Sequence, residues 1–262
     1  MTVYIKELKG SFKSWCIWTG AIVFMLLVCI LIFPEMKDQM EGVTDIFSDM
    51  GDFTAAFGMD KLNFGEIMGY YGTECGNVLG IGGSFFAALT AAAVLSSEEK
   101  NRTAEFLFTH PVSRSNVLMQ KLLSVYTRII AMNIVITAAS VIGFAAIGEK
   151  VQFREFLLLH LAYMILQLEI GSVCFGISAF IRRGSIGIGI GIAFALYFLN
   201  IVCNISEQTE ALKYVTPFAY AEASDIITKS EIDVGLILIG CIYSAVGVCA
   251  GFVKYTKKDL AA

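Results

Sequence analysis

Residues 96–121 read SSEEKNRTAEFLFTHPVSRSNVLMQK, and this stretch decides how the rest of the chain is arranged. It holds seven charged side chains and separates an apolar run that ends at Leu95 from another that begins at Leu122. An apolar run of about 20 residues is long enough to cross a bilayer as a helix. Residues 96–121 are therefore expected just outside a membrane, where they face an aqueous partner.

The same stretch has the pattern of a helical elbow. Ser96 and Glu99 have the spacing of a capping box, and apolar residues follow at helical intervals, which predicts a short amphipathic helix. Pro111 ends this helix because proline disfavours a helical conformation at the residue before it. Ser113 then caps a second helix over residues 114–147. At 1.5 Å per residue that helix is about 50 Å long, so it protrudes beyond a hydrocarbon core of roughly 30 Å.

Composition places the whole chain in a membrane. Of its 262 residues 56% are hydrophobic, and the mean hydropathy is +0.71, far from the values of soluble domains. We predict one all-α domain over residues 1–262. It consists of a basic amphipathic helix on the inner membrane surface (1–14), the elbow, and six transmembrane helices at about 15–33, 76–95, 122–147, 156–181, 185–203 and 233–253.

The distribution of basic residues sets the orientation. With both termini in the cytoplasm, 13 of the 19 lysines and arginines lie inside and six lie outside. This bias agrees with the positive-inside rule, and the opposite orientation would violate the rule at nearly every short loop. The elbow is therefore expected on the cytoplasmic side.

Two spans carry small residues at four-residue spacing, which lets a neighbouring helix approach closely. We expect both stripes to be packing faces. They are Gly76, Gly80, Ser84, Ala88 and Ala92 in the second span, and Gly187, Gly191 and Ala195 in the fifth.

Glu169 lies midway along the fourth span, where an ionised carboxylate costs around 3 kcal/mol on insertion scales. We expect it to face the inside of the bundle, with Gln167 nearby, as an intramembrane polar site. Two interpretations stay open. Glu169 is either a polar contact in a substrate path or dimer interface, or a hydrogen-bond partner that fixes helix packing.

The elbow also resembles a known family. The resemblance rests on Glu98-Glu99, Thr103, Glu105, Leu107 and Pro111-Val112-Ser113-Arg114, followed by Lys121. Members of the ABC-2 type family of transporter permeases read Glu-Glu-x-x-x-Gly-Thr-x-Glu-x-Leu-Leu and then Pro-Val-Ser-Arg. This chain differs at Arg102, where Gly is usual, and at Phe108, where a second Leu is usual. Residues 55–76 and 214–227 also resemble the outer loops of that family.

This resemblance implies a role for each elbow residue. The elbow would be the coupling helix, which sits in a groove of a separate ATPase subunit. Polar contacts would come from Glu98, Glu99, Arg102, Glu105 and Arg114. Phe106, Leu107 and Phe108 would supply apolar contacts, Pro111 would hold the elbow angle, and Thr103, Val112, Ser113 and Lys121 complete the set.

The resemblance also implies the assembly. Two permease protomers, identical or different, would work with two ABC ATPase subunits in a bacterial plasma membrane, in contact with lipid and not with nucleic acid. ATP and Mg would be bound by the ATPase, because this chain has no Gly-x-x-x-x-Gly-Lys-Ser/Thr sequence and is not an enzyme by itself. The cargo would be an exported amphipathic or apolar peptide, lipid or drug.

Two other classes are weighed against this interpretation. An ion-coupled secondary transporter would use Glu169 as its coupling site. An intramembrane hydrolase would use Glu98-Glu99 with Arg102 and Phe156-x-x-x-His160, which loosely resemble the prenyl-protein endopeptidase family. The arginine comes one residue too early for that motif, and the chain lacks His-Glu-x-x-His and Gly-x-Ser-x-Gly sequences.

Overall fold

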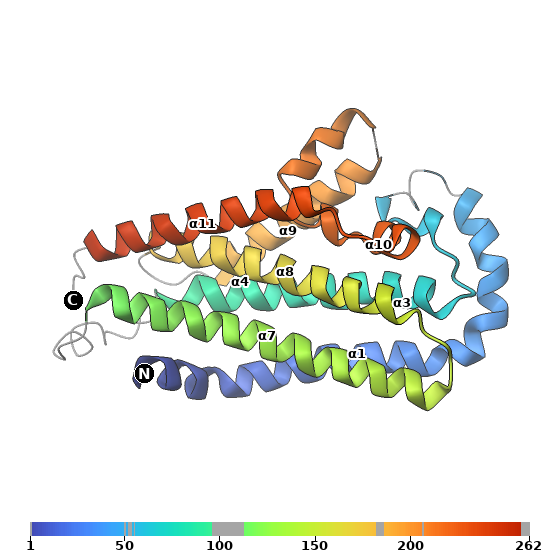
Figure 1. Ribbon diagram of the computed structural model, residues 1–262, viewed down its shortest axis with the longest axis horizontal. Helices are drawn as coiled ribbons and strands as arrows, with labels where there is room; N and C mark the ends of the chain where they lie inside the picture. The colour runs from blue at the N-terminus through green and yellow to red at the C-terminus, as the bar shows by residue number, and fades with distance from the viewer. Residues whose placement is uncertain are drawn as a thin grey trace.

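The structure is a computed structural model that describes residues 2–49, 51, 54, 56–95, 113–181, 186–205 and 207–257. These residues form helices and no strand, and six of the helical segments are long and apolar enough to cross a membrane. Figure 1 shows the spans along one common axis, with the start of α1 and the end of α11 at the same end of the bundle. The chain is thus an all-helical, multi-pass membrane protein, as its composition predicts.

The first helix differs from the prediction. α1 (Thr2–Asp49) is one continuous helix of 48 residues with Pro34 inside it, so no separate helix lies on the membrane surface. The N-terminal part instead packs on α7: the Tyr4 backbone N–H donates to Gln120 Oε1 at 3.2 Å, and the Tyr4 hydroxyl lies 3.0 Å from Thr127 Oγ1. The prediction was wrong because the first residues continue α1 and bind along the start of α7 through Tyr4.

The helix after the elbow is the one that the sequence predicts. α7 spans Arg114–Ile147, and its N-cap Ser113 accepts a hydrogen bond from the backbone N–H of Asn116 at 3.3 Å. Its C-cap is Gly148, which has φ 71°, a left-handed conformation that favours glycine. The cap and the apolar length of this helix are both local properties, and both are confirmed.

The second span is longer and less regular than expected. It consists of α3 (Ile67–Cys75), the π-helix η2 (Gly76–Ile81) and α4 (Gly82–Val94). It therefore begins nine residues before the predicted start at residue 76. The remaining spans are α8 (Phe153–Ser178), α9 (Ile186–Ile205) and α11 (Val234–Lys257). At the end away from the start of α1 lie η1 (Met59–Lys61), η3 (Glu207–Tyr214), η4 (Ala219–Ala221) and α10 (Ala223–Lys229).

The small-residue stripe of the second span is a packing face. A Cβ added to Gly80 would lie 3.0 Å from a ring carbon of Tyr163 on α8. Further along, a Cβ on Gly189 of α9 would lie 2.8 Å from the Ala88 carbonyl oxygen and 3.0 Å from the Ala92 methyl. α8 and α9 thus approach the second span closely because it lacks bulky side chains there.

The stripe predicted on the fifth span is not such a face within this chain. Gly187, Gly191 and Ala195 are exposed, and no described atom lies within 4 Å of a Cβ built on Gly191. The contact with α4 is made by the opposite face, through Gly189 and the buried Ala193. Within this chain, the close contact of α9 therefore lies on the face opposite to the predicted stripe.

α8 and α11 also cross at glycines. A Cβ on Gly176 would overlap the carbonyl oxygen of Gly247, and a Cβ on Gly251 would lie 2.9 Å from Gly176 Cα. Backbone therefore packs directly on backbone at this crossing.

Gly176→Ala and Gly191→Ala should change stability in opposite directions. The first adds a methyl group where there is no room, which costs about 1–3 kcal/mol by overpacking. The second fills open space and favours the helix by up to about 1 kcal/mol. Thermal unfolding of the two purified variants in the same detergent tests this. Equal shifts for both would contradict the described crossing.

Candidate functional site

Most of the predicted coupling residues lie outside the described residues. These are Glu98, Glu99, Arg102, Thr103, Glu105, Phe106, Leu107, Phe108, Pro111 and Val112. The structure does describe the two ends between which they run, Leu95 after α4 and Ser113 before α7. It also describes Arg114 and Lys121 on α7. The site is therefore built from the anchors of the elbow.

Lys121 is buried and holds three helices together. Its side chain is 0% exposed, and its ammonium lies 2.8 Å from Glu7 Oε1 on α1 and 2.8 Å from the Val94 carbonyl oxygen on α4. Val94 is the last residue of α4, and the helix dipole favours a cation at this end of the helix. Lys121 thus fixes the exit of α4, the start of α1 and the first turns of α7 relative to one another.

Arg114 makes a comparable link at the start of α7. Its guanidinium donates to the carbonyl oxygen of Thr256 at 3.2 Å, in the last turn of α11. A cation is again placed at the C-terminal end of a helix. The two residues together connect the return point of the elbow to α1, α4 and α11.

The two residues of the predicted intramembrane site point in different directions. Gln167 accepts a hydrogen bond from Asn133 Nδ2 at 2.7 Å and donates to the Leu79 carbonyl oxygen in the π-helix at 3.1 Å. Glu169 instead accepts from the Tyr220 hydroxyl at 2.8 Å. Residues two apart on a helix are about 200° apart around its axis, so the two side chains do not form one site. Gln167 fixes helix packing, and Glu169 lines a separate groove between α8, α9 and α11.

His160 has a partner on each ring nitrogen. Nε2 lies 2.8 Å from the Tyr71 hydroxyl, and Nδ1 lies 3.0 Å from Thr137 Oγ1. Within the described ranges, no group of three or more His, Cys, Asp or Glu is placed to hold a metal ion. His160 is therefore a buried hydrogen-bonding residue, and this geometry gives the hydrolase interpretation no support.

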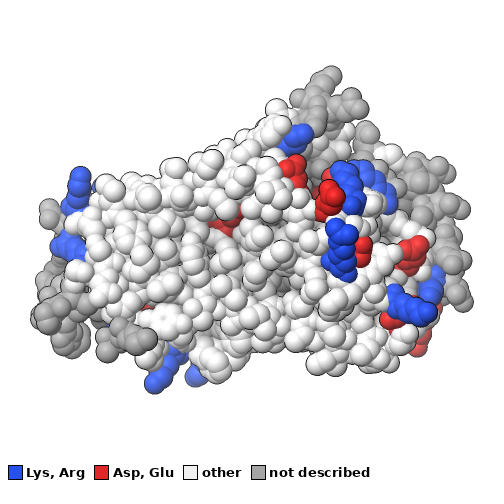
Figure 2. Space-filling model, in the orientation of Figure 1, with Lys and Arg blue, Asp and Glu red and all other residues white. Residues whose placement is uncertain are grey.

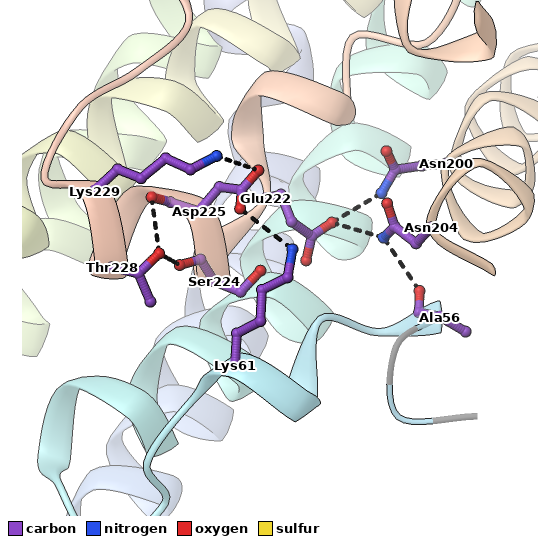
Figure 3. Close-up of polar contacts among 9 residues, drawn as sticks. All are labelled: Ala56, Lys61, Asn200, Asn204, Glu222, Ser224, Asp225, Thr228 and Lys229. Atoms are coloured by element: carbon purple, nitrogen blue, oxygen red, sulfur yellow. Dashed lines mark hydrogen bonds and ion pairs between the residues drawn. The ribbon is translucent and has the colours of Figure 1, made fainter. Parts of the chain in front are cut away.

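A polar cluster at the opposite end of the bundle was not predicted. Glu222, which precedes α10, accepts hydrogen bonds at Oε2 from Asn200 Nδ2 at 3.0 Å and Asn204 Nδ2 at 3.2 Å, as Figure 3 shows. Asn204 also donates to the Ala56 carbonyl oxygen at 3.3 Å. Burial raises the pKa of Glu222 above its ordinary value of 4.5, although the two asparagine hydrogen bonds lower it in part. The signal available in the sequence was the pair Asn200 and Asn204, four residues apart on one helical face of an apolar span.

Charged residues surround this cluster. Asp225 accepts from Lys61 at 3.4 Å and from Lys229 at 3.3 Å, and all three side chains are partly exposed. They line a cavity of about 710 Å³ together with Glu222 and Ser224. The cluster ties η1, α9 and α10 together at this end of the molecule.

The fold and these contacts define a multi-pass helical membrane protein, in which Lys121 and Arg114 of α7 are bound to α1, α4 and α11. A model of the family described as "ABC-2 family transporter protein" matches residues 1–260, nearly the whole chain, and the chain belongs to that family. A search of curated protein sequences gave no match. Members of the family are membrane subunits without an ATPase domain of their own, so an ATPase partner is implied.

Replacement of Lys121 should destabilise the protein strongly. Lys121→Met removes the charged donor to the Glu7 carboxylate, which is 22% exposed, and to the buried Val94 carbonyl group. Loss of a charged donor to such groups costs about 1.5–3 kcal/mol. Lys37→Met is the matched control, because the Lys37–Glu149 pair is 40% and 26% exposed and such pairs are worth up to about 1 kcal/mol. Thermal unfolding in detergent should separate the two variants clearly, and similar shifts would contradict the role given to Lys121.

The Glu222 cluster should make stability depend on pH. Because the folded state raises the pKa of Glu222, it holds a proton that the unfolded state loses, and stability falls as pH rises from about 4.5 through the raised value. The slope is at most about 1.4 kcal/mol per pH unit. Glu222→Gln should remove this part of the slope. Unfolding midpoints measured between pH 4 and 8 test the prediction, which fails if both proteins show the same slope.

Proposed function

We propose that this chain is the permease subunit of an ATP-driven exporter. Two copies of the chain, or this chain and a related one, would work with two ATPase subunits that bind ATP and Mg. The observation that carries the proposal is the anchoring of the elbow, because its two ends are joined to α1, α4, α7 and α11 through Lys121 and Arg114.

The anchors suggest how a movement would be transmitted. When the ATPase subunits bind ATP and close, the elbow would follow the groove in which it sits. The buried Lys121 contacts would pass this displacement to α1 and α4, and the Arg114 contact would pass it to the end of α11. The two protomers would then rock apart toward the outside and open a path for the cargo.

The orientation follows from the charges. We place the elbow and both termini in the cytoplasm, on the basis of the positive-inside bias, and the protein in a bacterial plasma membrane. The start of α1 and the end of α11 lie at one end of the bundle, as this topology requires. The Glu222 cluster would then lie at the outer surface.

We propose an apolar or amphipathic cargo, such as a peptide, lipid or drug, because few charged residues lie within the spans. Figure 2 shows charged side chains gathered toward the two ends of one face, with a broad band between them that is nearly free of charge and suited to contact with lipid. The family match favours this function over an ion-coupled carrier.

Capture of the ATPase tests the proposal. We would co-purify the wild-type chain with a candidate ABC ATPase subunit from the same organism, and compare a Glu98→Lys, Glu105→Lys double variant. The wild type should retain the ATPase and modulate its activity, whereas the variant should lose it because two carboxylates that contact the groove become cations.

A second double variant controls for charge alone. Glu35→Lys, Glu231→Lys makes the same change at two exposed positions away from the elbow and should bind the ATPase as the wild type does. If the wild type captures no ATPase, or if both double variants lose it equally, the proposal is wrong.

A further inference from the structure

A groove opens between α8, α9 and α11 and is closed on one side by residues 213–217. Its volume is about 410 Å³, within the range of pockets that take drug-sized ligands. Most of its wall is apolar and includes Ile170, Val173, Ile192, Ile239 and Val246. Such a wall removes an apolar chain from water or lipid headgroups, but it does not by itself select a ligand.

Glu169 gives the groove a charge. It is the one acidic residue among the lining side chains, and it is 5% exposed. The one basic residue there, Lys213, comes from η3, and its ammonium lies 5.4 Å from the centre of the Tyr214 ring. The carboxylate therefore lies in apolar surroundings within the membrane-spanning part of α8.

The carboxyl group is held in place and still has acceptor capacity. Tyr220 donates to Oε2 at 2.8 Å, whereas Oε1 is approached by the Cys241 thiol at 4.0 Å, a weak donor. Gly240 makes room for the group, since a Cβ at that position would overlap both carboxyl oxygens. An ionised carboxylate can accept about four hydrogen bonds, so Oε1 can receive a further N–H donor.

We propose that this groove binds an amphiphile with one cationic amine, and that Glu169 pairs with the ammonium while the apolar walls cover the chain. Pairing offsets the cost of an ionised carboxylate in the membrane, which is around 3 kcal/mol on insertion scales. The inference rests on the proposed function, because it names the class of cargo that the permease would take up.

Photolabelling of the complete permease–ATPase complex in lipid nanodiscs tests this. The probes are dodecylammonium and dodecanol, each with the same diazirine in its chain. The ammonium probe should label groove peptides of α8 and α11 saturably, and the alcohol should not. Glu169→Gln should weaken labelling by the ammonium probe by about tenfold or more, the equivalent of one charge-assisted hydrogen bond.

Two further variants keep the test decisive. Glu155→Gln changes a carboxylate of the same helix that bonds Ser230 outside the groove, and it should label as the wild type does. Val246→Trp fills the groove from a residue that is 62% exposed and should abolish labelling with Glu169 in place. Val246→Trp therefore tests whether the probe occupies the groove even if Glu169→Gln does not fold.

Three results would overturn the proposal. Equal labelling by both probes would show that the groove is a seam filled by lipid. Full labelling of Glu169→Gln would show that the carboxylate does not select the amine. Labelling by neither probe would show that a second copy of the chain covers the groove. Binding of the ATPase subunit is measured separately in each preparation. If the chain does not bind the ATPase but the ammonium probe still labels the groove, the proposed function is wrong and the amine site stands.

Discussion

The requirement that polar groups inside a bilayer find partners within the protein determines the position of α8, on which the rest of the bundle depends. Gln167 bonds Asn133 on α7 and the backbone of the π-helix η2, and Glu169 bonds Tyr220 of η4. His160 and Ser172 add contacts with α3 and α7. These bonds point to different sides of α8. The helix therefore lies among its neighbours with little freedom to rotate.

Glycines allow close approach at the same helix pairs. Gly80 on the second span and Gly176 on α8 allow close approach, so α8 packs between the second span and α11. At the elbow end, Lys121 and Arg114 place cations on the terminal carbonyl groups of α4 and α11. The bundle is thus fixed in its centre by hydrogen bonds and at the elbow end by charges.

Local features of the sequence predicted part of this structure. The Ser113 cap and the apolar length of α7 predicted Arg114–Ile147, because both act within one helix. The continuous first helix was not predictable in this way, since residues 1–14 follow α7 only once the two helices meet. The contact face of α9 was not predictable for the same reason, because glycine spacing shows that a face lacks bulky side chains and does not show which neighbour covers it.

The cluster at Glu222 joins segments that are more than 140 residues apart. Asn200 and Asn204, four residues apart in an apolar span, were the only indication of it in the sequence. The opposite directions of Gln167 and Glu169 could have been predicted from the helical angle.

We propose that residues 96–112 bind the ATPase and that Lys121 and Arg114 carry its movement into the spans. Hydrogen–deuterium exchange of the reconstituted protein, with and without the ATPase subunit, tests this directly. Amides of residues 96–112 should exchange more slowly in the complex, while those of residues 207–229 at the opposite end should not change until ATP is added. A complex that forms with no protection of residues 96–112, or with protection only at the opposite end, would show that this coupling path is wrong.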